Sequence, residues 1–170
     1  MNYLDRRDYI QKILMNSESA VKGQDFADEL GVTRQIIVKD IAILRAAGVN
    51  IIATPDGYIM DKKDKKLNSK VLVLSHERDE IEDELKTIIR YGGIVEDIIV
   101  EHQLYGEIKA TLMLKTIYDV EKFIKKLYEY KVEPLLKLTN GLHIHTIVTE
   151  TKEQMNNIIH ELDKKGYLIK

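Results

Sequence analysis

The chain contains no cysteine, so it can form neither a disulfide nor a thiolate metal site. It also lacks an uninterrupted apolar run of about 18 residues, the length that a membrane-spanning helix requires. Charged residues at positions 5–8 interrupt the apolar core that a secretory signal would need. These absences favour a cytoplasmic protein with no membrane partner, and 170 residues are enough for one medium domain or two small ones.

An excess of positive charge is missing as well. The formal net charge is -2, and residues 1–60 carry seven basic and eight acidic side chains. A nucleic-acid-binding protein with this balance has to rely on a local basic surface and on dimerisation, because its bulk charge does not attract phosphate.

The first 60 residues nevertheless follow the pattern of a helix-turn-helix. Gly31 can adopt the left-handed conformation that ends a helix, and Thr33 can cap the helix that follows. Apolar residues at helical spacing predict three helices, at 4–15, 23–30 and 34–47. The order of a short helix, a glycine turn and a longer helix is typical of a DNA-reading module.

A predicted hairpin follows these helices. The turn sequence Pro55-Asp56-Gly57 separates the apolar runs 49–54 and 58–60. A hairpin of this length after a helix-turn-helix indicates a wing, so the first half is predicted to be a winged helix-turn-helix domain.

The third predicted helix supplies the candidate DNA contacts. Gln35 and Lys39 lie opposite its apolar stripe, and Arg34 lies near its start. Arginine pairs well with guanine and glutamine with adenine. We therefore predict base contacts by Arg34 and Gln35, and contacts to phosphate or base edges by Thr33 and Lys39. The alternative is that these are only solvated polar positions on an amphipathic helix.

The charged segment 61–66 has no apolar residue and predicts a connector. We place a winged helix-turn-helix domain at 1–62, a linker at 63–69 and a second domain at 70–170. In the second domain, the pattern predicts strands at 71–74, 95–101, 107–114, 142–148 and 166–169 and helices at 77–91, 119–130 and 152–164. The expected fold is α+β, with a C-terminal α/β sandwich whose helices pack on one face of a mixed sheet.

All five histidines lie in this second domain. His143 and His145 share one face of a predicted strand, where two imidazoles side by side can bind a divalent metal. His76 lies at the end of another strand and offers a third ligand. Three histidines with one carboxylate suit Zn, Ni or Fe. Three carboxylates on one helical stripe are candidates, and spacing does not choose among them: Glu77, Glu80 and Glu84.

A DNA reader joined to a histidine-bearing domain indicates a sensor that switches transcription. The second half has no G-x-S-x-G, no phosphate-binding glycine loop and no H-E-x-x-H, so we expect no enzyme. Three other hypotheses stay open at this point. The chain could be a metal sensor, a small enzyme of the biotin-ligase kind fused to a helix-turn-helix, or a DNA-binding scaffold whose histidines are polar surface residues.

Over nearly its whole length the sequence resembles the niacin-responsive transcriptional repressors of the NiaR family. The resemblance rests on several motifs that follow one another in the family's order along the chain. They are residues 31–35 and 40–45, residues 73–76, residue 102 and residues 105–107, and residues 141–146.

The resemblance implies one metal site per chain, for Zn or Ni, at His76, Glu84, His143 and His145. It also implies a homodimer that binds a palindromic operator when nicotinic acid is present as corepressor, and that represses genes of NAD synthesis or niacin uptake. The matching stretch around His102 and Tyr105 is predicted to bind this effector. His160 matches none of the family's motifs and is expected on a helix surface.

Overall fold

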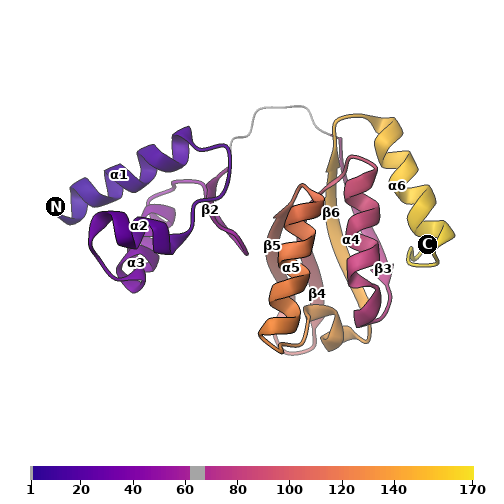
Figure 1. Ribbon diagram of the computed structural model, residues 1–170. Helices are drawn as coiled ribbons and strands as arrows, with labels where there is room; N and C mark the ends of the chain where they lie inside the picture. Colours follow the sequence, from indigo (N-terminus) through magenta and orange to yellow (C-terminus); the bar gives the residue numbers. More distant parts are fainter. Residues whose placement is uncertain (1, 62–67) are drawn as a thin grey trace. The chain divides into compact units, whose positions relative to one another are not determined.

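The computed structural model describes residues 2–61 and 68–170. The chain divides into two compact units, Met1–Asp64 and Lys65–Lys170, and each has a hydrophobic core of its own (Figure 1). Most of the predicted linker, 63–69, lies outside the described residues. Within the described part of the chain, no helix combines the length and apolarity needed to cross a membrane.

The first unit is the predicted winged helix-turn-helix. Gly31 ends the second helix with φ 64°, and the Thr33 side chain accepts the amide of Ile36 and so caps the third. The two strands pair antiparallel as a hairpin. The elements are α1 (Tyr3–Asn16), α2 (Gly23–Leu30), α3 (Arg34–Ala46), β1 (Ile51–Thr54) and β2 (Gly57–Met60).

A buried carboxylate ties α3 to α1. Asp40 is 1% exposed, and its oxygens accept hydrogen bonds from Arg6 Nε at 2.5 Å and Arg7 Nε at 2.8 Å. Burial alone would raise the pKa of Asp40, but the hydrogen bonds from the two guanidinium groups outweigh it and lower that pKa. α3 is therefore held against α1 by an ion pair as well as by apolar packing.

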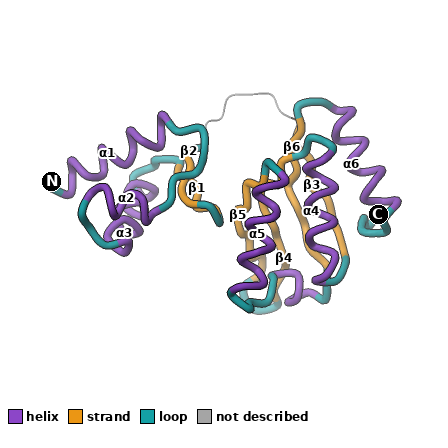
Figure 2. Tube along the Cα trace, viewed as in Figure 1, coloured by secondary structure: helices purple, strands orange, loops and turns teal. Residues whose placement is uncertain are grey.

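The second unit is a four-stranded sheet covered by helices (Figure 2). Its strands are β3 (Asn68–Ser75), β4 (Ile94–His102), β5 (Gly106–Leu114) and β6 (Leu142–Thr149). Its helices are α4 (Ile81–Arg90), α5 (Ile117–Glu129) and α6 (Lys152–Lys164), with short 3-10 turns at Arg78–Glu80 and Leu135–Thr139. Buried residues from all three helices join those of the sheet in one core, so the helices cover one face as predicted.

The prediction of a mixed sheet is wrong, because every pair of neighbouring strands is antiparallel. The order is β3-β6-β4-β5, so β6 is inserted between the two strands that α4 connects. β3 and β4 run parallel to each other, as a strand-helix-strand unit requires, but they are not neighbours. The α+β class is confirmed, whereas the pairing could not be read from the order of elements along the chain.

The predicted last strand is reduced to a single antiparallel bridge. Leu168 pairs with Leu74, and the amide of Ile169 donates to the Val73 carbonyl at 2.9 Å. The chain end therefore runs along the free edge of β3, which brings Tyr167 next to the end of that strand.

Replacing Asp40 tests the link between α1 and α3. Asp40→Asn is expected to lower the free energy of unfolding of the first unit by about 1–3 kcal/mol at neutral pH, because the negative charge is lost and one of the two acceptor oxygens becomes an amide donor that faces a guanidinium group. Since the folded-state pKa is lowered, this contribution is present above the unfolded pKa and is lost as pH falls through the folded value. The measurement is a urea titration followed by the amide NMR signals of α1 and α3.

Asp8→Asn, on the exposed side of α1, is the matched control and should leave the free energy of unfolding unchanged. A difference between wild type and Asp40→Asn that stays the same at about pH 3 as at neutral pH would contradict the role of the ionised carboxylate.

Candidate metal centre

Three imidazoles meet one carboxylate beneath the helices of the second unit. His143 and His145 project from the same face of β6, where they pair with Leu74 and Leu72 of β3. His76 directly follows β3, and Glu84 lies in the first turn of α4. All four side chains are buried, with exposed fractions of 7% for His76, 1% for Glu84 and His143, and 2% for His145.

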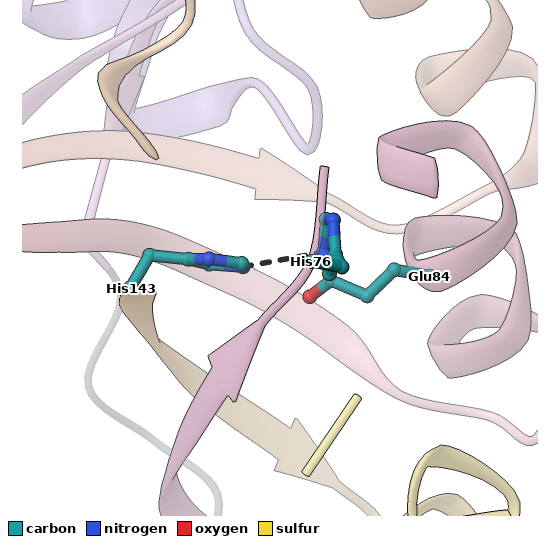
Figure 3. Close-up of side chains that lie close together, drawn as sticks. All are labelled: His76, Glu84 and His143. Carbon is teal, nitrogen blue, oxygen red and sulfur yellow. Dashed lines mark hydrogen bonds and ion pairs between the residues drawn. The ribbon is translucent and has the colours of Figure 1, made fainter. Parts of the chain in front are cut away.

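The imidazoles present their Nε2 atoms to the two oxygens of Glu84. Figure 3 shows the side chains of His76, Glu84 and His143 pointing toward one another. His76 Nε2 is in close contact with Glu84 Oε2, and His143 Nε2 lies 3.3 Å from the same oxygen. His145 Nε2 lies 3.0 Å from Oε1. The ligand atoms of His76, Glu84 and His143 all lie within 4.8 Å of one another, close enough to hold one metal ion.

The other nitrogen of each ring is held by the backbone. A carbonyl oxygen can only accept a hydrogen bond, so each Nδ1 must carry the proton and a neutral ring keeps its lone pair on Nε2. Metal-binding histidines are commonly oriented in this way. The acceptors are the carbonyl oxygens of Glu77 for His76 at 2.8 Å, Gly141 for His143 at 2.8 Å and Asp97 for His145 at 2.5 Å.

Gly141 allows the two strands that carry the histidines to approach closely. It has φ 97°, and a Cβ atom built on it would lie 2.5 Å from the carbonyl oxygen of His76. A side chain at this position would therefore push the start of β6 away from the end of β3. The glycine belongs to the site for a steric reason that sequence reasoning did not identify.

The charges of the cluster depend on one another. Burial would raise the pKa of Glu84, but the three histidines outweigh it and hold that pKa well below its usual value. Burial likewise opposes protonation of His76 and His145, yet the Glu84 carboxylate raises the pKa of both. The buried carboxylate thus recruits positive charge, which protons or a divalent cation can supply.

The donor set fits a transition metal. Glu84 Oε1 is buried and accepts no well-aligned hydrogen bond from the described residues, although His145 Nε2 is near it. A buried carboxylate oxygen without a well-aligned donor is compensated by a nearby cation, which a protonated imidazole or a metal ion can supply. Imidazole nitrogens with a carboxylate suit Zn, Ni or Fe and do not suit Mg or Ca. Among the described residues, the ligand atoms that lie close enough together for one ion come from His76, Glu84 and His143, without His145.

The alternative carboxylates are used elsewhere. Glu77 and Glu80 form a capping box at the 3-10 turn that precedes α4, in which the Glu80 side chain accepts the amide of Glu77 at 2.9 Å. Glu84 is therefore the member of the acidic stripe that reaches the histidines.

Tyr167 covers His76 at the edge of the cluster, and sequence reasoning gave no signal for it. The two ring centroids lie 5.0 Å apart, and the Tyr167 hydroxyl donates to Asp83 Oδ2 at 2.8 Å. Burial and the Asp83 carboxylate raise the pKa of Tyr167, so the hydroxyl stays protonated and keeps donating. Lys165 donates to the same carboxylate, at 2.7 Å from Oδ2.

The two predicted effector residues lie at the end of β4 and in the turn that follows it. His102 and Tyr105 flank the turn between β4 and β5, where His102 Nδ1 accepts the amides of Leu104 at 3.1 Å and Tyr105 at 3.3 Å. Tyr105 is 74% exposed, and its ring centroid lies 5.2 Å from that of His102. The described contacts do not join this pair to Glu84.

The predicted DNA-binding residues lie at the exposed start of α3. Arg34, Gln35 and Lys39 are exposed, and Thr33 is exposed while its hydroxyl oxygen caps the helix. His160 is exposed on α6, as expected for a histidine outside the site.

Comparison with known proteins agrees with this architecture. Residues 69–170 match the family model of the 3H domain, and residues 6–59 match that of an HTH domain, which implies DNA binding. The chain is 43% identical to a protein of Thermotoga maritima named "Probable transcription repressor NiaR", over 97% of this chain and 94% of that one.

A second relative is the "Transcription repressor NadR" of Bacillus subtilis, which is 34% identical over 98% of this chain and 94% of its own length. Both relatives are named as repressors rather than enzymes, which confirms the expectation of a non-enzymatic protein. The chain belongs to the NiaR/NadR family of transcription repressors, with an N-terminal HTH domain and a C-terminal 3H domain that holds the buried His-Glu cluster.

Proposed function

We propose that this repressor acts on genes of NAD synthesis or niacin uptake, as a homodimer that binds a palindromic operator when nicotinic acid occupies its metal-containing C-terminal domain. The observation that carries the proposal is the convergence of three imidazole Nε2 atoms on the buried Glu84 carboxylate. The resemblance to niacin-responsive repressors supplies the identity of the effector.

His76, Glu84, His143 and His145 would hold the ion, Zn or Ni. When bound, the ion supplies a coordination position that the ring nitrogen or the carboxylate of nicotinate can fill. The chain fixes this site in advance, because backbone carbonyls already set the orientation of the three rings. The proposed effector contacts at His102 and Tyr105 lie on a turn whose backbone His102 itself holds.

Nicotinate can act on DNA binding only through its different affinity for two arrangements of the dimer. The favoured arrangement places the two recognition helices about one DNA turn, ~34 Å, apart. Arg34 and Gln35 would then contact bases, and Thr33 and Lys39 would contact phosphate or base edges.

A second candidate is a metal-responsive repressor, in which the ion itself is the signal. The burial of all four side chains favours this alternative, since a site filled by protein ligands leaves little room for an effector. The two candidates differ in whether the metal alone strengthens operator binding.

Removing the metal ligand His143 tests the metal-containing effector site. For wild type loaded with Ni²⁺, nicotinate is expected to strengthen binding to an operator selected from random DNA by at least tenfold, about 1.4 kcal/mol of coupling. Chelator-treated wild type should lose this response because it lacks the ion, and His143→Ala should lose it because the ion is missing one of its ligands. Fluorescence anisotropy of labelled operator measures the affinities.

His160→Ala, an exposed histidine on α6, is the control and should respond as wild type does. An equal response to nicotinate in metal-free protein and in His143→Ala would show the metal-containing effector site to be wrong. If Ni²⁺ without nicotinate strengthens operator binding to the full extent, the metal-responsive mechanism replaces the proposed effector site.

The DNA-binding role of α3 is tested by the salt dependence of operator affinity. Lys39→Ala is expected to reduce the slope of log affinity against log salt by about one per subunit, because one phosphate contact is lost. Gln35→Ala should weaken binding by about 1–3 kcal/mol and relax the preference at one base pair of each half-site.

Lys12→Ala removes an exposed lysine of α1 and is the control for bulk charge. If it lowers the slope as much as Lys39→Ala does, the assignment of Lys39 to a phosphate contact fails.

A further inference from the structure

β4 is irregular on both sides at the point where it passes the candidate metal centre. It uses three residues, 96–98, to span the interval that β6 spans with two, 145 and 146. Beside β5 the extra residue lies on the other strand, where Met113 has φ 51°. Such bulges interrupt the ladder and re-aim groups next to functional sites.

Asp97 lies in this bulge and makes two different contacts with β6. Its carbonyl oxygen accepts the Nδ1 proton of His145 at 2.5 Å, and its side-chain Oδ1 accepts the amide of Thr146 at 2.8 Å. An amide inside an antiparallel ladder ordinarily donates to a backbone carbonyl of the neighbouring strand. The Asp97 carboxylate takes that place here, and the Asp97 carbonyl holds the imidazole instead.

Asp97 is only 2% exposed, so its buried carboxylate requires compensation. Lys109 on β5 places Nζ 3.3 Å from Oδ2, and the Lys109 side chain is itself 54% exposed. The lysine offsets charge from the solvent side, whereas the hydrogen bond to Thr146 fixes the carboxylate within the sheet. These two contacts have separate roles and can be removed separately.

We propose that Asp97 is a positioning residue for the metal centre, whose carboxylate holds the bulge open so that its own carbonyl fixes the orientation and the tautomer of His145. This inference rests on the proposed metal site. Without the carboxylate, the amide of Thr146 has to find another acceptor in the bulge, and the Asp97 carbonyl loses its fixed place. His145 Nε2 would then point at Glu84 only part of the time.

The test compares metal affinity in Asp97→Ala and Asp97→Asn. Loss of such an orienting group is expected to weaken Ni²⁺ and Zn²⁺ binding about 10–100-fold in Asp97→Ala, measured by competition with a chromophoric chelator. Asp97→Asn keeps an amide oxygen that can accept the amide of Thr146. Its affinity for Ni²⁺ and Zn²⁺ should therefore stay within about threefold of that of wild type. The visible spectrum of the Co²⁺-loaded protein should change in Asp97→Ala and not in Asp97→Asn.

Lys109→Met is the matched control for metal affinity, which it should leave unchanged. It removes the cation beside Asp97 and leaves the hydrogen bond between Asp97 and Thr146. Wild-type affinity in Asp97→Ala overturns the inference, and so does an equal loss in both Asp97 variants. If Asp97→Ala does not fold by circular dichroism, Asp97→Val, a β-branched residue that suits a strand and offers no hydrogen-bond acceptor, takes its place.

A measurement on the metal-free protein tests the positioning role of Asp97 independently of whether the site binds a metal. The ¹⁵N signals of the His145 ring report whether Nδ1 keeps its hydrogen bond. They should shift in Asp97→Ala and stay unchanged in Asp97→Asn, even if wild type binds no metal and the proposed function fails. Unchanged signals in Asp97→Ala overturn the positioning role whatever the metal affinity is.

Discussion

The second unit is organised around the buried carboxylate of Glu84 and the three imidazoles that face it. A carboxylate that is 1% exposed destabilises a fold unless cations or hydrogen-bond donors compensate it. His76, His143 and His145 provide that compensation, and the backbone holds each ring by its other nitrogen. The polar cluster is therefore part of the interior of the domain. Whether protons or a metal ion occupy it affects the stability of that interior.

Strand order brings these groups together. Because β6 is inserted between β3 and β4, its two histidines lie beside the end of β3, which His76 directly follows, and beside the bulge of β4, which contains Asp97. α4 covers this face and supplies Glu84 from its first turn. A metal ion bound at the cluster would therefore link the end of β3, β6 and α4.

Local signals were sufficient for part of this description. Gly31 and Thr33 marked the helix-turn-helix, and strand alternation placed His143 and His145 on one face. Spacing could not choose among three carboxylates, because the capping box that occupies the other two depends on the path of the chain before α4. The choice of Glu84 came from the family resemblance, and the contacts with the histidines agree with it.

Features set by pairing between distant segments were not predictable. The antiparallel sheet, the bulge at Asp97 and the cover provided by Tyr167 all depend on which strands become neighbours. The central claim is that Glu84 and three imidazoles bind one transition-metal ion. X-ray absorption spectroscopy of the Ni²⁺-loaded protein tests it most directly. We predict a first shell with three imidazole nitrogens and a carboxylate oxygen that is lost in Glu84→Gln, whereas a shell of water oxygens, unchanged in Glu84→Gln, would contradict it.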